Sequence, residues 1–190
     1  MNRVLVALLL ALGAFPSVTR AQSIEQKAQV CTTCHGEHGV PVEQSFPVPV
    51  IWGQNPGYLF FELRDFKTGA RKNEQMTPVA DALEHDDLMP LAQYFAKQQW
   101  PKLQQPQPPP DVAAAAQHVN AAVVCTNCHQ AGFMGDNAQP RLAGQVRAYL
   151  QKTMTDARSG ARDNNVGMTS LFKELTDQDI AAMAAWLAAK

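Results

Sequence analysis

Two copies of one five-residue pattern contain every cysteine of this 190-residue chain. Residues 31–35 read Cys-Thr-Thr-Cys-His, and residues 125–129 read Cys-Thr-Asn-Cys-His. In each copy two thiols stand three positions apart and a histidine follows directly, so a helical turn brings the two thiols to one face. Any fold of this chain must present the same cluster twice, at positions 94 residues apart.

The pattern C-x-x-C-H is the attachment site of c-type haem. Two thiols at this spacing each form a thioether with one vinyl group of a haem edge, and the histidine brings an imidazole nitrogen beneath the iron. We therefore predict two covalently bound haem c groups. Their thioether cysteines would be Cys31, Cys34, Cys125 and Cys128, and their proximal iron ligands His35 and His129.

Three other uses of paired cysteines fit this sequence less well. A zinc ribbon places its second pair about 15–20 residues after the first, whereas 90 residues lie between Cys34 and Cys125 here. A thioredoxin-like protein needs one redox-active pair rather than two. Disulfides within each pair would leave both histidines unexplained.

The first residues indicate an export signal. One arginine ahead of an apolar run over residues 4–15, and small residues near Ala21, are typical of a secretory signal peptide, which we expect to span 1–21. The run is shorter than the roughly 20 apolar residues that cross a bilayer. An uncleaved membrane anchor is the alternative. A net charge of −1 shows no basic excess, which argues against a nucleic-acid partner.

The duplication extends beyond the cysteines. Several further segments recur at an offset of 91 residues, and the proline-rich stretch 101–110 lies between the two sets. Such a stretch cannot hold a helix and predicts an extended linker. We therefore expect two domains, 22–100 and 111–190, with one haem each. The matched segments are Trp52-Gly53-Gln54 with Ala143-Gly144-Gln145, Tyr58-Leu59 with Tyr149-Leu150, Gly69-Ala70-Arg71 with Gly160-Ala161-Arg162, and Pro49 with Pro140.

Helix signals recur through both halves, and the sequence contains no convincing alternating strand. Ser23 with Gln26 predicts a capping box for the helix that carries Cys31, and Thr176 predicts a similar start for the last helix. Asp111 is expected to cap the helix that runs to Val124. The pattern predicts an all-α fold.

Two further helix signals lie in the first half. Asn55-Pro56 opens a helix over residues 58–67 that Gly69 ends. Pro90 lies near the start of its last helix and predicts a distorted first turn.

The second axial ligand of each iron is expected to be a methionine. Met76 lies 41 residues after His35, and Met168 lies 39 residues after His129. Both occur in polar segments before the last helix, where a flexible thioether can reach the iron. The other methionines are assigned to packing or lack a partner in the repeat, and bis-histidine ligation is the alternative. These other candidates are Met89, Met134, Met154, Met183, His38, His85 and His118.

Two more matched pairs suggest roles around the haem. A carbonyl near Pro49 or Pro140 would accept the second ring N–H of the haem histidine and fix the imidazole. A simple rigid turn is the other interpretation. Arg71 and Arg162 would pair with haem propionates, or they would be ordinary solvated arginines.

These residues together resemble the dihaem class I cytochromes of the cytochrome c4 family. The resemblance covers essentially the whole chain after the signal segment, and it implies two tandem cytochrome c-like helical domains, each wrapping one covalent haem. It also implies Met76 and Met168 as distal ligands. The expected function is a periplasmic electron carrier that passes single electrons from a quinol-oxidising complex to a terminal oxidase, meeting the membrane through these partners.

Two other functions remain open. In the first, the chain is the dihaem subunit of a dehydrogenase, such as a flavocytochrome sulfide dehydrogenase. In the second, it is a small dihaem peroxidase. Two six-coordinate haems leave no open iron position for a substrate, which favours electron transfer over catalysis.

Overall fold

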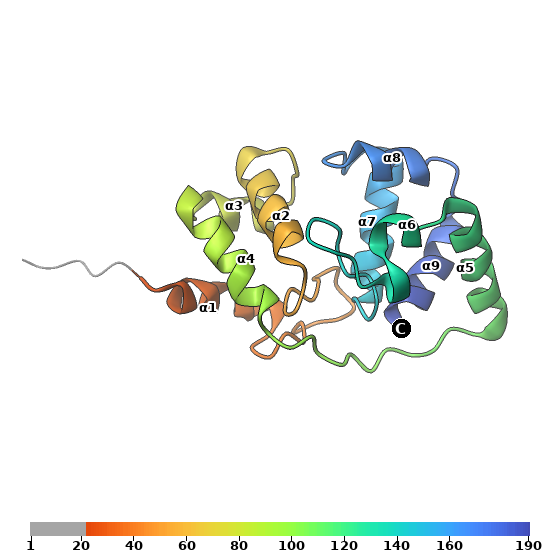
Figure 1. Cartoon of the computed structure of the whole chain (residues 1–190), viewed down its shortest axis with the longest axis horizontal. Coiled ribbons are helices and arrows are strands. Elements are labelled where there is room, and N and C mark those ends of the chain that lie inside the picture. The colour runs from red at the N-terminus through yellow and green to blue at the C-terminus, as the bar shows by residue number, and fades with distance from the viewer. Residues whose placement is uncertain (1–21) are drawn as a thin grey trace, which may run out of the picture.

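The computed structural model describes residues 22–190, so the predicted signal segment 1–21 lies outside the described residues. These residues form helices joined by loops (Figure 1). The first group is α1 (Ile24–His35), α2 (Pro56–Thr68), α3 (Met76–Asp81), the 3₁₀ turn η1 (His85–Asp87) and α4 (Leu88–Ala96). The second group is α5 (Pro110–Val123), α6 (Thr126–His129), the 3₁₀ turn η2 (Ala131–Phe133), α7 (Arg147–Ser159), α8 (Val166–Phe172) and α9 (Asp177–Ala188).

The all-α fold is confirmed. Over residues 22–190 the extended pairing is limited to one isolated bridge between Asp136 and Gln139. Within the same residues, no helix combines the length and apolar character that crossing a membrane requires.

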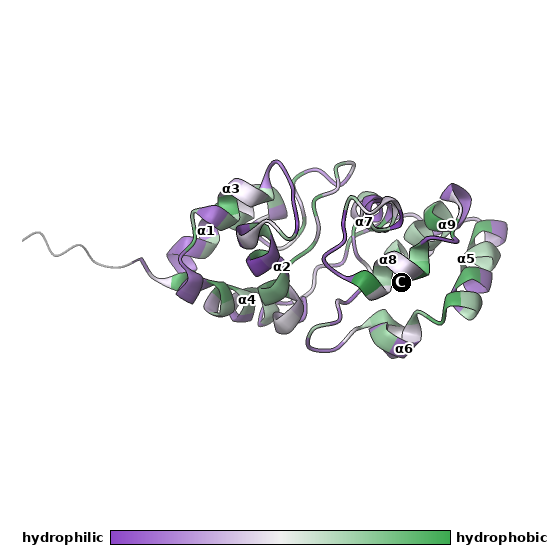
Figure 2. Cartoon of the chain, turned by 90° about the horizontal axis from the view of Figure 1, so that it is seen from above, coloured by the Kyte–Doolittle hydropathy of each residue, from purple (hydrophilic) through white to green (hydrophobic). Residues whose placement is uncertain are grey.

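The helices pack within two groups that follow each other along the chain. In the first group α4 packs against α1 and α2, and α2 also contacts α3; in the second, α9 packs against α5 and α7, and α7 contacts α8. Figure 1 shows the two groups side by side, with α2 and α7 nearest the centre. Apolar residues, drawn in green, are frequent in α4 and α9, the helices at the centre of the two groups (Figure 2).

Each group has its own apolar core. The first is centred on the last helix α4, through Leu91 and Phe95, which contact the α1 and α2 side chains of Ala28 and Leu59. The second is larger because α9 buries most of its length. Its central residues are Ile180, Met183, Ala184 and Leu187, with Val119 from α5 and Leu150 from α7.

The local helix signals give mixed outcomes. Ser23 and Thr176 form the predicted capping boxes, and Gly69 ends α2 in the left-handed conformation. Asp111 was wrongly expected as a cap, because α5 begins one residue earlier at Pro110. Proline is favoured at the first helical position, where its missing N–H loses no hydrogen bond.

The two C-x-x-C-H segments lie in different local structures. The first is entirely within α1. In the second, Val124 adopts φ of 54° and ends α5, so the cysteines and histidine begin a separate short turn, α6. Pro90 is the third residue of α4, which follows directly on η1. The predicted distorted start is therefore the 3₁₀ turn ahead of the proline.

The segment between the groups is extended and is fixed along the second group. Gln105 donates from its side chain to the carbonyls of Gln145 and Ala188, at 2.9 Å and 3.1 Å. Its own amide oxygen accepts from the Arg147 N–H at 2.8 Å. Gln107 donates to the Ala189 carbonyl at 3.0 Å. The proline-rich stretch is therefore packed along the second group rather than free in solvent.

Removal of the α9 cap is expected to destabilise the second group. The Thr176 hydroxyl accepts the Asp179 N–H at 3.1 Å and donates to the Asp179 carboxylate at 2.7 Å, so Thr176→Ala should cost about 1 kcal/mol at pH 7. That hydroxyl and the Thr176 N–H hold the pKa of Asp179 below its usual value. A carboxyl with a lowered folded-state pKa stabilises above its unfolded pKa of about 3.9. This part of the stability is lost as the pH falls through the folded value.

Chemical denaturation of the haem-loaded protein at pH 7 and near pH 3 measures this difference. Ser170→Ala is the matched control, because Ser170 is an exposed residue inside α8 that caps no helix. An equal loss for Thr176→Ala at both pH values would contradict the role of the Asp179 carboxylate.

Candidate functional site

The two histidines of the repeated pattern have the same fixed geometry. His35 ends α1, His129 ends α6, and both are buried, at 7% and 5% exposure. The Nδ1 atom of His35 lies 2.8 Å from the Pro49 carbonyl oxygen, and that of His129 lies 3.0 Å from the Pro140 carbonyl oxygen. The predicted role of the two proline carbonyls is confirmed.

These contacts set the state of each imidazole. A carbonyl oxygen only accepts hydrogen bonds, so Nδ1 must carry the proton and donate it. Burial lowers the pKa of His35 and of His129, although each carbonyl contact opposes that shift. Both rings are therefore neutral, and Nε2 keeps its lone pair. A neutral imidazole held in this way is ready to bind a metal through Nε2.

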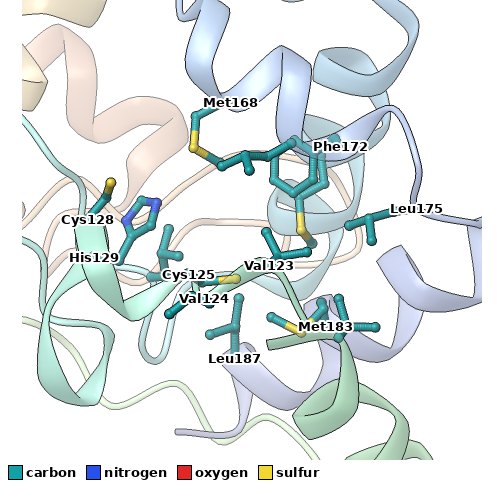
Figure 3. A pocket seen from close by; sticks show the side chains of 14 residues that line it. Val123, Val124, Cys125, Cys128, His129, Met168, Phe172, Leu175, Met183 and Leu187 are labelled. Carbon is teal, nitrogen blue, oxygen red and sulfur yellow. The ribbon is translucent and has the colours of Figure 1, made fainter. Parts of the chain in front are cut away.

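In the second group an apolar cavity lies beside His129. Cys125, Cys128, His129 and Met168 line it, together with aliphatic and aromatic side chains from α5, α8 and α9 (Figure 3). The figure shows the Met168 sulfur across the cavity from the His129 ring. A larger hollow of about 560 Å³ continues from the same residues towards α2 of the first group. The structure therefore brings together all four predicted site residues of this half.

Met168 is distinguished from its neighbours by the repeat. Met154 and Met183 also line the cavity, but both belong to the packed core of the second group. The residue 91 positions before Met154 is Leu63, and the one before Met183 is Ala92. By contrast, Met76 lies 92 residues before Met168, within one position of the repeat offset.

Both methionines are preceded by an asparagine that fixes their backbone. The Asn73 side-chain oxygen accepts the Met76 N–H at 2.9 Å, and the Asn165 side-chain oxygen accepts the Met168 N–H at 3.1 Å. The sequence contains this signal as an asparagine three residues before each methionine. The two asparagines were not among the predicted site residues, although an asparagine or aspartate at this spacing is a known helix-start pattern.

The first group presents its site differently. Met76 begins α3 and is half-buried, and Cys31 packs against the first core, whose surrounding side chains include Trp52. The Trp52 indole N–H is buried without a hydrogen-bond partner among residues 22–190. Buried N–H groups are normally paired, so this donor is suited to an acceptor carried by a bound group. The pairing of Met76 with His35 rests on the repeat.

The partly buried thiols of Cys31 and Cys125 are not arranged for thiolate chemistry. Burial raises the pKa of Cys31 to about 11 and also raises that of Cys125. Zinc ligands and redox-active cysteines need the thiolate form. Over residues 22–190, no three histidine, cysteine or acidic side chains converge as a metal site would require. The zinc and thioredoxin-like interpretations therefore remain unsupported.

The three remaining histidines lie at the surface. His38 and His118 are exposed, and the His85 side chain is 76% exposed beside Asp86. None of them lines either described cavity. This arrangement favours methionine over a second histidine as the distal ligand.

A buried charge cluster joins the two groups where α2 faces α7. Glu62 on α2 forms ion pairs with Arg71 from its own group and with Arg162 from the other. Both arginine side chains are at most 14% exposed, so the solvated alternative for them is wrong. Arg162 also lines the larger hollow, and its pairing with a haem propionate stays a prediction.

Two matched tyrosines complete this Glu62 cluster. The hydroxyl oxygens of Tyr58 and Tyr149, one from each group, are 3.0 Å apart. Burial and the negative charge of Glu62 raise the pKa of Tyr58. Burial would also raise the pKa of Tyr149, but the guanidinium groups of Arg71 and Arg162 outweigh it and lower the value to about 8. The Tyr149 hydroxyl also accepts from the Arg71 guanidinium at 3.5 Å, so the matched tyrosines extend the charge cluster across the contact.

The residues present fit a covalent haem. The second half offers an apolar cavity with a neutral imidazole, a thioether and two cysteines at its wall. The first half repeats the cysteines, the fixed histidine and the asparagine-held methionine, and it adds an unpaired buried donor. Histidine with methionine is an axial ligand pair of cytochromes c, so these residues would be able to hold a haem iron between them.

Comparisons with known proteins find related cytochromes over most of the chain. The sequence profile of the family described as Cytochrome c matches residues 112–189. Cytochrome c4 of Azotobacter vinelandii is 34% identical, with 98% of each chain covered. The crystal structure of reduced recombinant cytochrome c4 from Pseudomonas stutzeri superposes with a TM-score of 0.77 at 28% identity, covering 87% of this chain and 96% of that one. A thiosulfate dehydrogenase electron acceptor of Stutzerimonas stutzeri is 30% identical, covering 85% of this chain and 79% of that one.

Neutralising Glu62 is expected to loosen the contact between the groups. In Glu62→Gln two buried guanidinium groups lose their shared countercharge, and breaking a buried ion pair costs about 3 kcal/mol. Guanidinium denaturation of the haem-loaded protein measures the change. Glu74→Gln is the control, because Glu74 is exposed in the same half. Equal stability of the two variants would contradict a structural role for the Glu62 cluster.

Proposed function

Because this chain belongs to the cytochrome c4 family, we propose that it carries single electrons through the periplasm from a quinol-oxidising complex to a terminal oxidase. As a family member it is an electron-transfer cytochrome with two covalently bound haem c groups. Each haem supplies one-electron exchange between ferric and ferrous iron. Export by the 1–21 segment is part of the proposal, since haem attachment to C-x-x-C-H and a periplasmic carrier both require it.

In this proposal each half holds one haem with its own residues. Cys31 and Cys34 form the thioethers of the first half, with His35 and Met76 as axial ligands. Cys125, Cys128, His129 and Met168 take the same roles in the second half. The observation that carries the proposal is the placement of His129 and Met168 across one apolar cavity, with the His129 proton fixed on the far ring nitrogen.

The same geometry supports a carrier rather than an enzyme. A thioether above and an imidazole below leave no open coordination position for a substrate. The methionine also raises the reduction potential relative to bis-histidine ligation, which suits the accepting of electrons from a quinol-oxidising complex. The chain then has only to enclose the cofactor, exclude water and present its edge to a partner.

A second candidate is the electron-accepting subunit of a dehydrogenase. The thiosulfate dehydrogenase electron acceptors among the relatives favour this class. The dihaem subunit of a flavocytochrome sulfide dehydrogenase would belong to the same class. Both candidates use the same two haems and differ only in the electron donor.

The assignment of the distal ligands is tested by replacing each methionine with leucine, which cannot bind iron. Met76→Leu and Met168→Leu should each remove about half of the sulfur-to-iron charge-transfer band of the oxidised protein. Each should also lower the reduction potential of one of the two one-electron waves, because the methionine ligand that raises this potential is lost. Absorption spectroscopy during a redox titration records both changes.

Met183→Leu provides the control, since it changes core volume little at a methionine that lines the same cavity. It should keep the full band. High-spin iron in the unaltered protein, or an unchanged band in either ligand variant, would overturn the assignment.

Rapid-mixing kinetics with purified partners distinguish the two candidate electron donors, a quinol-oxidising complex and a dehydrogenase. Our proposal expects fast reduction by a quinol-oxidising complex and reoxidation by a terminal oxidase. If the second candidate holds instead, thiosulfate dehydrogenase with its substrate reduces the protein faster than the quinol-oxidising complex does. Met168→Leu serves as the control, because its altered site should slow transfer in both assays.

A further inference from the structure

Two matched glutamines cross between the groups in the same way. Gln54 and Gln145 stand 91 residues apart, and both are buried at 2% exposure. The Gln145 side chain accepts the Val50 N–H at 2.7 Å and donates to the Val50 carbonyl at 2.9 Å. The Gln54 side chain accepts the Arg141 N–H at 2.7 Å and donates to the Arg141 carbonyl at 3.0 Å. Each amide thus binds both backbone groups of one residue in the opposite half.

The bound residues directly follow the two prolines. The carbonyl of Pro49 and the N–H of Val50 are two ends of one planar peptide group. The carbonyl end accepts the His35 Nδ1 proton at 2.8 Å, while the N–H end donates to Gln145. The Pro140 and Arg141 peptide joins His129 to Gln54 by the same two bonds.

Each chain of bonds therefore leads from a glutamine, through one peptide, to a histidine of the other half. Peptide resonance couples the two ends of the group. When the N–H donates to a glutamine oxygen, the carbonyl oxygen becomes a stronger acceptor, because linked hydrogen bonds polarise one another. A stronger acceptor at Nδ1 makes the imidazole a more basic ligand. Burial strengthens the effect, since water does not compete for these groups.

We propose that each half tunes the haem of the other: Gln145 lowers the reduction potential at the His35 haem, and Gln54 lowers it at the His129 haem. A more basic histidine stabilises ferric iron and disfavours the added electron. The glutamines are positioning residues that act through the proline peptides. The proposal rests on the proposed ligation by His35 and His129. It makes the potential of each haem dependent on the contact between the two groups.

The test compares Gln145→Met with Gln54→Met in the haem-loaded chain. Methionine has a similar volume but cannot accept the peptide N–H as an amide oxygen does. Gln145→Met should favour reduction of the His35 haem about threefold, equal to about 28 mV at 59 mV per tenfold change. The His129 haem should stay unchanged. Gln54→Met should give the opposite pattern. Redox titration followed by proton NMR assigns each wave to its own haem.

A second readout follows the histidine proton itself. In the reduced protein, labelled with ¹⁵N-histidine, Gln145→Met should move the His35 Nδ1–H resonance upfield, as a weaker hydrogen bond does. The His129 resonance should stay in place. Gln145→Glu keeps an oxygen acceptor for the Val50 N–H and should leave the His35 resonance downfield. A merely structural role would not produce this difference between the two variants.

Asn55→Ala is the control for general loosening of the contact. Its side chain donates to the carbonyls of Met134 and Gln139 across the same contact, yet it touches neither peptide that follows a proline. It should change neither potential. Equal shifts at both haems in Gln145→Met, or a shift at the haem of its own half, would overturn the proposal. Failure of the proposed function is distinct, because it would appear as slow reduction of the unaltered protein by the quinol-oxidising complex, whatever the potentials of the glutamine variants.

Discussion

The hydrogen bond from a histidine Nδ1 to a proline carbonyl is the contact on which the arrangement of each half depends. It joins the end of the helix that carries the cysteines to the loop ahead of the middle helix. That loop is tied in turn to the last helix, since the N–H groups of Gly53 and Gly144 donate to the carbonyls of Phe95 and Leu187. Three separate parts of the chain are thus linked through one loop beside the imidazole. These links fix the direction in which the Nε2 atom of the histidine points.

The two halves of the sequence repeat are related in space by an approximate two-fold axis. One charged residue, Glu62, has no charged counterpart at the matching position. Matched residues face each other across the contact, as Tyr58 does with Tyr149. The same relation would bring Arg71 and Arg162 together as buried like charges. Glu62 lies between them and pairs with both, while the matching position holds Thr153. The single carboxylate of Glu62 is therefore shared by both arginines. A second carboxylate at the Thr153 position would add an unpaired buried charge.

Structural features that depend on residues close together in the sequence could be predicted. Features that depend on contacts between the two groups of helices could not. The capping boxes at Ser23 and Thr176 involve residues three apart, so their side chains alone specify them. The histidine–proline contact was also accessible, because the repeat kept both members at matched positions. By contrast, Arg162 appeared solvated or propionate-bound because its partner Glu62 lies 100 residues away. Met89 was expected in the core, yet it is 38% exposed, since α4 buries the face that carries Leu91 and Phe95 and Met89 falls outside it.

The crossing glutamines give the contact between the halves a physical consequence beyond stability. In an isolated half, the N–H of the residue after the proline would bond to water, whose orientation fluctuates. In the joined protein it meets an amide oxygen that is buried, fixed by its own neighbour's N–H at 2.8–2.9 Å, and shielded from solvent. A fixed acceptor in a low-dielectric setting polarises the peptide more strongly than a mobile one. The environment of each histidine therefore includes the surface of the opposite half, so two haem sites that share a local sequence pattern are not independent.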